Sequence, residues 1–202
     1  MAVRLLAWDA PNMDMTLAKL LDGRPRPSQR PDLTVLHRWF VEGAGAGDHS
    51  EAAVFVNVPE HLADRMTGWV LYLCQTGFRV FAKPKIGPSD IDDEMAAYLT
   101  ERPPSDVAEV VIASHDARAF LDVAERLAAA GVKVNVLGFR EFAGQFVQSD
   151  AVRFVDAATV DDLFADLPQR VSLSDLPPEG RWFEPTAPVT AHVEPVDVDV
   201  SA

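Results

Sequence analysis

Short apolar runs alternate with longer stretches of helical spacing through most of the chain. The runs are rich in β-branched or aromatic residues and predict strands at 3–8, 52–58, 78–82, 107–113, 132–137 and 152–155. The stretches between them predict helices at 13–21, 33–41, 61–76, 90–100, 117–130 and 160–167. This alternation predicts βαβ units, and the near-continuous apolar strands predict a mostly parallel sheet that helices cover on both faces, an α/β fold.

Proline-rich segments lie outside this pattern. Residues 22–31 contain three prolines, which predict an exposed loop that also carries Arg24, Arg26 and Arg30. From about residue 176 onward, five prolines and repeated pairs of Val with an acid show no periodic apolar face, which is typical of disorder. The sequence therefore predicts one domain over 1–170 and a disordered, acidic, proline-rich tail over 171–202.

Charge and cysteine content narrow the classes of function. The net charge of −13 argues against non-specific binding of duplex nucleic acid, although part of that charge lies in the predicted tail. The single cysteine, Cys74, excludes an internal disulfide and a cysteine-based metal site. The first apolar run is too short for a signal peptide or a membrane span, so we expect a cytoplasmic protein without a membrane partner.

Acidic side chains follow the predicted strands. Asp9 ends the first strand, Asp116 follows the strand at 107–113, and Asp92 starts the helix after the third strand. Ligands bind at the carboxyl ends of the strands in open parallel sheets, so we expect these three carboxylates to converge. A cation must neutralise such a group, and ligands that are all oxygen favour Mg²⁺ or Mn²⁺. The pattern thus favours metal-assisted hydrolysis of a phosphodiester.

Each acid alone has a simpler explanation. Asp near a helix start usually caps the helix or offsets its dipole, and this holds for Asp92 and Asp116. Asp9 is harder to explain as a cap, because the following helix is predicted to begin nearer Asn12 or Asp14. His115, a lone histidine beside a strand end, is more often a hydrogen-bonded structural residue than a general base.

Four segments carry a resemblance to a known family. Residues 9–13, DAPNM, resemble the D-x-x-N-L opening of NYN domains, a branch of the PIN-like ribonuclease group. Residues 91–95, IDDEM, are similar to the family's V-D-x-x-L helix start, and 110–116, VVIASHD, resemble its apolar strand that ends in S-G-D. Residues 131–139, GVKVNVLGF, resemble its G-x-x-V-x-V-x-G-F strand. The four segments occur in the family's order.

The resemblance implies a Rossmann-like three-layer fold of the PIN-like type and a ribonuclease that uses Mg²⁺ or Mn²⁺. Asp9, Asp92 and Asp116 would take the catalytic, metal-binding positions. Asn12 would hold the first loop and contact the substrate backbone. Basic residues would hold flanking phosphates of RNA, although ordinary solvated surface charges are the commoner case. These residues are Lys83, Lys85, Arg24, Arg26 and Arg30.

Two departures from the family's pattern favour an alternative. Arg118 stands where the family has a fourth acid, and Tyr98 stands where a further Asp is common. The alternative is a catalytically weakened module that binds RNA or a protein partner, and a homo-oligomer is also open. A different phosphotransfer domain is disfavoured, because a haloacid-dehalogenase-like site needs a second Asp where Pro11 stands, and a receiver domain places its acids on other strands.

Overall fold

The computed structural model describes residues 2–45, 48–87, 90–167 and 176–183. The chain divides into two compact units, Met1–Pro168 and Gln169–Ala202. Within the second unit, residues 176–183 include a turn in which the Gly180 amide donates to the Pro177 carbonyl. The disorder predicted for the tail falls mostly on 171–175 and 184–202, which lie outside the described residues, and it stays a prediction.

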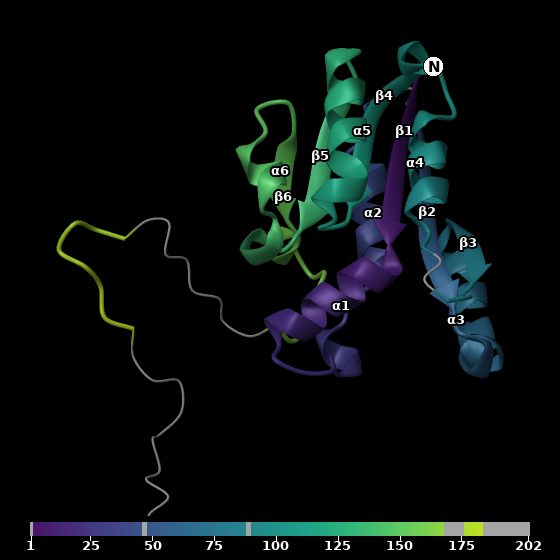
Figure 1. Cartoon of the computed structure of the whole chain (residues 1–202), viewed down its shortest axis with the longest axis horizontal. Helices are drawn as coiled ribbons and strands as arrows, with labels where there is room; N and C mark the ends of the chain where they lie inside the picture. Colours follow the sequence, from purple (N-terminus) through teal and green to yellow (C-terminus); the bar gives the residue numbers. More distant parts are fainter. Residues whose placement is uncertain (1, 46–47, 88–89, 168–175, 184–202) are drawn as a thin grey trace, which may run out of the picture. The chain divides into compact units, whose positions relative to one another are not determined.

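The first unit is built on a six-stranded sheet whose strands are all parallel, in the order β3-β2-β1-β4-β5-β6 (Figure 1). The strands are β1 Val3–Asp9, β2 His49–Val58, β3 Phe78–Pro84, β4 Val107–Ala113, β5 Lys133–Gly138 and β6 Arg153–Asp156. All six predicted strands are present, and their ends differ from the predicted ones by a few residues. The predicted α/β fold with a parallel sheet is confirmed.

Helices cover both faces of the sheet. They are α1 Ala10–Leu20, α2 Leu33–Glu42, α3 Ala63–Thr76, α4 Asp92–Thr100, α5 Ala117–Ala129 and the short α6 Gln145–Gln148. Alternate residues of β1 point to opposite sides, so Leu5 packs with α4, α5 and α6 in one core cluster, whereas Leu6 packs with α1, α2 and α3 in the other. The domain therefore has three layers.

The order of the strands creates a switch point at β1. The chain runs from β1 to β2 and β3 on one side and then returns to place β4 on the other side of β1. Crossovers that leave in opposite directions open a crevice at the carboxyl ends of the two adjoining strands, where open α/β sheets bind ligands. Asp9 ends β1, and Asp116 lies in the short loop that follows β4, so these two predicted acids flank the crevice.

A polar group inside the sheet joins three strands away from the crevice. Glu109 on β4 is 6 % exposed and pairs with Arg4 of β1 at 2.5 Å and with Lys133 of β5 at 2.7 Å. Its Oε1 also accepts a bond from Asn135 Nδ2. Burial alone would raise the pKa of Glu109, but these bonds hold the pKa below its usual value. The buried carboxylate is therefore ionised, and the charges of Arg4 and Lys133 compensate it.

Two sequence-based expectations about helices are wrong. Residues 160–167 form turns instead of the predicted helix, and the backbone of Asp162 adopts a left-handed φ of 60°. The first helix begins at Ala10, with Pro11 in its first turn, and Asp9 is its N-cap. Proline is well suited to the first turn because its missing N–H has no partner there in any case. Among the described residues, no helix has the length and apolar character to cross a membrane.

Candidate functional site

Asp9 is held rigidly at the end of β1. Only 3 % of the residue is exposed. Its Oδ1 accepts the Asn12 backbone amide at 3.1 Å, which caps α1, and its Oδ2 accepts the hydroxyl of Ser114 at 2.8 Å. The carboxylate therefore has a fixed orientation, and both of its oxygens are anchored by neighbours on β1–α1 and on the loop after β4.

Ser114 connects Asp9 to Asp116. The serine is fully buried, and its hydroxyl donates to Asp9 while it accepts the Asp116 amide at 3.2 Å. Asp116 in turn caps α5, because its Oδ1 accepts the amides of Arg118 and Ala119 at 3.0 and 3.3 Å. The sequence-based expectation that Asp116 caps a helix is confirmed. Capping occupies Oδ1, and no described residue bonds its Oδ2.

Asn12 and His115 tie the two loops of the crevice together. The Oδ1 of Asn12 accepts the His115 backbone amide at 2.9 Å and lies 3.3 Å from its ring Nδ1. The other ring nitrogen of His115, Nε2, accepts a hydrogen bond from the Phe139 backbone amide at 2.7 Å. The rings of His115 and Phe139 also stack. This pattern requires a neutral imidazole that carries its proton on Nδ1. Burial lowers the pKa of His115 to about 4, so its role here is structural, as expected.

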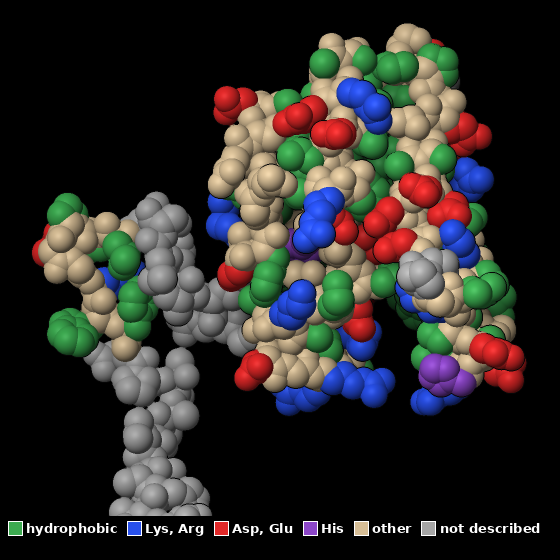
Figure 2. Space-filling view, viewed as in Figure 1, with side chains coloured by type: hydrophobic (Ala, Val, Ile, Leu, Met, Phe, Trp, Pro, Cys, Tyr) green, Lys and Arg blue, Asp and Glu red, His purple; other side chains and the backbone are tan. Residues whose placement is uncertain are grey.

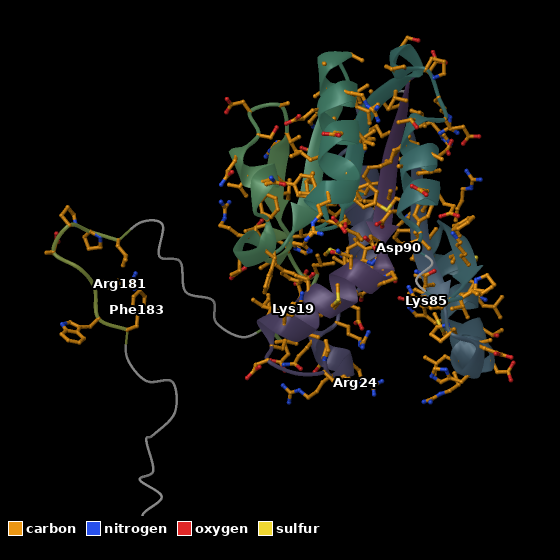
Figure 3. The ribbon with its side chains drawn as sticks, in the orientation of Figure 1. Lys19, Arg24, Lys85, Asp90, Arg181 and Phe183 are labelled. Atoms are coloured by element: carbon orange, nitrogen blue, oxygen red, sulfur yellow. The ribbon has the colours of Figure 1, made fainter. Side chains whose placement is uncertain are left out.

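Asp92 and Asp90 bring negative charge from the start of α4. Asp92 lies in the first turn of the helix and is half-buried, whereas Ile91 holds the cap position. Figure 3 shows Asp90 beside the end of β1 and the start of α1. Acidic side chains gather in this region of the surface (Figure 2). The crevice thus receives carboxylates from β1, from the loop before α5 and from the start of α4.

Burial and mutual repulsion raise the pKa values of two of these acids. Burial raises the pKa of Asp9 to about 6, and the charges of Asp90 and Asp116 add to the effect against the two hydrogen bonds. Burial likewise raises the pKa of Asp92 to about 6, with further contributions from Asp90, Asp9 and Asp116. The structure therefore brings the three predicted acids within electrostatic reach of one another, together with Asp90.

The donor set has the chemistry of a site for a hard cation. It offers only carboxylate oxygens, and within the described parts of the chain no Lys or Arg forms an ion pair with Asp9, Asp92 or Asp116. The described residues contain no group of three or more His, Cys, Asp or Glu side chains that could by itself hold a metal ion. Carboxylate oxygens fit a hard ion such as Mg²⁺, which keeps several of its waters and takes few protein ligands.

The basic residues predicted to bind substrate lie in different settings. Lys83 Nζ bonds Glu94 Oε1 at 2.6 Å and the Asp90 carbonyl at 2.9 Å, which lowers the pKa of Glu94. Arg26 pairs with Asp166, and Arg30 pairs with Asp14. Lys85 follows β3, and Arg24 lies beyond the far end of α1 (Figure 3).

The two departures from the family pattern have separate outcomes. Arg118 is exposed, and its guanidinium makes no ion pair with Asp116 or with any other described acid, so it leaves the charge of the crevice uncompensated. Tyr98 packs against the core beside Phe55, with ring centroids 5.5 Å apart. Burial raises the pKa of the Tyr98 hydroxyl to about 12, so it stays protonated.

Sequence reasoning missed the residues that support the acids. Ser114 and Gly138 belong to matched motifs, but neither has chemistry that stands out in the sequence. Gly138 is required because a Cβ at this position would lie 2.6 Å from His115 Nε2. Asp90 was recognisable as a further acid near Asp92, yet only the folded chain shows that its charge reaches Asp9.

One solved structure with a similar fold matches this chain over almost its own full length. A protein of unknown function, VPA0982 from Vibrio parahaemolyticus RIMD 2210633, is 22 % identical, with a TM-score of 0.58, over 81 % of this chain and 95 % of that chain. At this identity the likeness shows the fold alone. Arabidopsis thaliana UGT89C1 complexed with UDP is 14 % identical over 68 % of this chain and 35 % of that one, and its TM-score of 0.33 carries no argument.

A family assignment comes from the sequence itself. A search of curated proteins finds no match. The model of the NYN domain family, however, matches residues 5–161, a span that includes every strand from β2 to β6, most of β1, and Asp9, Asp92 and Asp116. Because the match covers most of the chain, this chain belongs to the NYN domain family.

Proposed function

We propose that the protein is a metal-dependent ribonuclease that hydrolyses RNA phosphodiester bonds in the crevice at the carboxyl ends of β1 and β4. One observation carries the proposal. Asp9 and Asp92 have raised pKa values among acids that no described cation pairs with, at the switch point of a parallel sheet. Membership of the NYN family, whose fold is that of PIN-like nucleases, supports the same class of reaction.

The residues divide into those that bind metal and those that position them. Asp9, Asp92 and Asp116 would hold Mg²⁺ or Mn²⁺, which would supply an activated water and stabilise the charge on the leaving oxygen. Ser114 fixes the Asp9 carboxylate, and the bond from His115 to Asn12 holds the loop that presents Asp116. His115 is no general base in this proposal, because Nε2 accepts the Phe139 amide.

Basic residues would bind the RNA backbone on either side of the crevice. Arg24 and Lys85 are exposed and are proposed to contact phosphates. Lys83, Arg26 and Arg30 are already paired with acids of the chain, so each would have to exchange its partner to bind a phosphate. We therefore expect these three to contribute less to RNA binding than Arg24.

Cleavage of RNA with Mg²⁺ or Mn²⁺ tests the proposal. The wild type should cleave, and Asp9→Asn should lose about a hundredfold or more of the rate, as is usual when one electrostatic partner of a transition state is removed. Asp122→Asn is the matched control, because Asp122 is an exposed acid on α5 and should leave the rate unchanged. A wild type without activity in either metal, or an Asp9→Asn variant as active as wild type, would overturn the assignment.

A binding module of the same fold is the second candidate. The observation that favours it is Arg118 at a position where the family has an acid, together with carboxylates that do not enclose a metal ion by themselves. Such a module would bind RNA without cleaving it, or would bind a protein partner. RNA binding that needs no divalent metal, in a chain that never cleaves, would support this candidate against the first.

A further inference from the structure

A cavity of about 620 Å³ lies beside α4, over β2 and the edge strand β3. Figure 1 shows α4 next to β2, with β3 at the margin of the sheet. The aromatic rings of Phe55, Phe81 and Tyr98 line the cavity, together with Arg79 and Glu94. Phe81 is 40 % exposed although it is a large apolar side chain, so the wall it forms is open to a ligand.

Two buried oxygen atoms belong to residues that line this cavity. Glu94 Oε2 and Tyr98 Oη are both buried, and neither has a hydrogen-bond partner within the described parts of the chain. The two residues are four apart on α4 and therefore lie on the same face of the helix, one turn from each other. Buried polar groups are nearly always bonded, so a pair left open in one cavity points to a ligand that completes them.

The two oxygens differ in what they can bond. Glu94 is paired with Lys83 through Oε1 at 2.6 Å, so it is a carboxylate whose Oε2 can only accept. The Tyr98 hydroxyl can donate. A ligand that bonds both oxygens needs a donor for Glu94 and an acceptor for Tyr98.

The aromatic walls favour a flat ligand. The Phe55 ring lies 5.7 Å from the Phe81 ring at 36° and 5.5 Å from the Tyr98 ring at 59°, and the guanidinium of Arg79 lies 6.0 Å from the Tyr98 ring centre. Stacking on aromatic rings is how proteins commonly hold unpaired bases of single-stranded nucleic acids. An unpaired base also has donors and acceptors side by side on one edge.

We propose that this cavity binds an unpaired nucleobase of the RNA strand, which stacks on the aromatic walls and bonds Glu94 and Tyr98 through its edge. The proposal rests on the proposed function and names a binding site for it. Glu94 comes two residues after Asp92 on α4 and so points to a different side of the helix. The cavity is nevertheless tied to the segment before α4, because Lys83 bonds both Glu94 and the Asp90 carbonyl. The base would therefore belong to a nucleotide that neighbours the scissile phosphate across α4. Tyr98, one of the two departures from the family pattern, would then contact the substrate base.

Nucleotide binding without metal provides the test. The wild-type chain in EDTA is titrated with guanosine 5′-monophosphate, and amide shifts in NMR spectra are followed for residues that line the cavity. Ribose 5-phosphate, which lacks a base, is the ligand control and should not shift these amides. Tyr98→Phe removes only the hydroxyl and should weaken nucleotide binding about fivefold, the usual effect of one lost hydrogen bond.

The second tyrosine of the chain provides a matched control. Tyr72 is 45 % exposed on α3 and does not line this cavity, so Tyr72→Phe should bind as the wild type does. Ala97 lines the cavity from an exposed position on α4, and Ala97→Trp should fill it and abolish binding while circular dichroism reports an intact fold.

Several results would overturn the inference. These are cavity amides that do not respond to the nucleotide, an equal response to ribose 5-phosphate, and full binding by both Tyr98→Phe and Ala97→Trp. Self-association that Ala97→Trp abolishes, in a chain that binds no nucleotide, would make the cavity a protein interface instead. Because the titration needs neither metal nor cleavage, a failed ribonuclease assay leaves its result intact, and the two proposals can fail separately.

Discussion

Asp9 combines two properties that oppose each other. Its side chain caps α1 and accepts the Ser114 hydroxyl, and both bonds stabilise the fold. The same carboxylate is 3 % exposed and faces the charges of Asp90 and Asp116, which makes its ionised form unfavourable. A cap alone needs no such burial, because a serine or an exposed Asp would serve equally well. The cost of the buried charge is what sets Asp9 apart from an ordinary cap.

Asp9→Asn should stabilise the metal-free protein at neutral pH. The pKa of Asp9 is raised from 3.8 to about 6, so the folded state holds its proton more tightly than the unfolded state does. Stability therefore falls as the pH rises from about 4 to about 6 and stays lower above that range. Two pKa units correspond to about 3 kcal/mol, which is the upper limit for the gain in the free energy of unfolding.

Urea unfolding in EDTA measures this gain. We expect Asp9→Asn to be more stable than wild type above about pH 7 and the difference to shrink as the pH falls, until it vanishes at about pH 3, where wild-type Asp9 is largely protonated in both states. The exposed Asp122→Asn should show no such pH dependence. An Asp9→Asn variant that is less stable than wild type at neutral pH would mean that the bonds of the carboxylate outweigh its desolvation.

Position along the chain was enough to find the acids but not the network around them. Asp9, Asp92 and Asp116 could be selected because each lies near a strand end, and parallel topology then brings such ends together. The bond from Ser114 to Asp9 joins residues 105 apart in the sequence, and it depends on how two loops meet. The sequence pattern does not predict the capping role of Asp9, because it places the start of the helix nearer Asn12 or Asp14, whereas the helix begins at Ala10 with Pro11 in its first turn.

At the scale of elements, the end of β5 is fitted to the loop after β4. Gly138 lies in register beside the start of this loop, and its missing side chain leaves room for the ring of His115. The His115 ring then accepts the Phe139 amide, so strand and loop are joined just where Asp116 is presented. A residue with no chemistry of its own thus helps to position the candidate site.

Gly138→Ala should destabilise the domain. The new Cβ would lie 2.6 Å from His115 Nε2, so the ring must move and its bond to the Phe139 amide is lost. Overpacking of this kind typically costs about 1–3 kcal/mol, which thermal or urea unfolding would measure. Movement of the loop should also lower RNA cleavage, since Asp116 follows His115 directly.

A second glycine provides a control of opposite sign. Gly68 lies within α3, and a Cβ there would meet no atom within 4 Å. Gly68→Ala should therefore raise the free energy of unfolding by up to about 1 kcal/mol, because alanine is the better helix former. If both variants changed stability in the same direction, the effect at Gly138 would come from backbone propensity and not from His115.

Elements with a strong pattern were predictable, and one weak element was not. The strands β4 and β5 are short segments rich in Val and Ile, residue types that favour strands. Residues 160–167 have helical spacing of apolar residues, but local turn geometry at Asp161 and Asp162 prevents a helix there. Glu109 within β4 gave no hint of burial, because its partners Arg4 and Lys133 come from distant strands.

At the scale of the whole molecule, strand order places the crevice. Alternating strands and helices predict a parallel sheet, but the order of these elements along the sequence does not predict that β4 lies beside β1. That return puts the ends of β1 and β4 next to each other, and it brings α4 and α5 together on one face. The resemblance to NYN domains implied a Rossmann-like three-layer fold and the three acidic positions, but it gave no strand order.

Metal binding at a crevice that exists only in the folded domain should stabilise the domain as a whole. A ligand that binds only the folded state raises the free energy of unfolding by about 2.7 kcal/mol at a hundredfold excess over Kd. Mg²⁺ or Mn²⁺ must displace protons from Asp9 and Asp92, whose pKa values are about 6. The stabilisation should thus be complete above about pH 7 and fade as the pH falls towards about 5, in contrast to the metal-free chain, which gains stability in that direction.

The same substitution should have opposite effects with and without metal, which separates a metal site from a merely acidic surface. Asp9→Asn should melt above wild type in EDTA and gain little from Mn²⁺, so the order of the two melting temperatures should reverse, or nearly so, as Mn²⁺ is added. Asp93→Asn, which removes an exposed acid from the same turn of α4, should keep the full response to metal. If wild type and Asp9→Asn responded alike to Mn²⁺ at neutral pH, the ion would bind elsewhere, and the buried charge of Asp9 would need a different explanation.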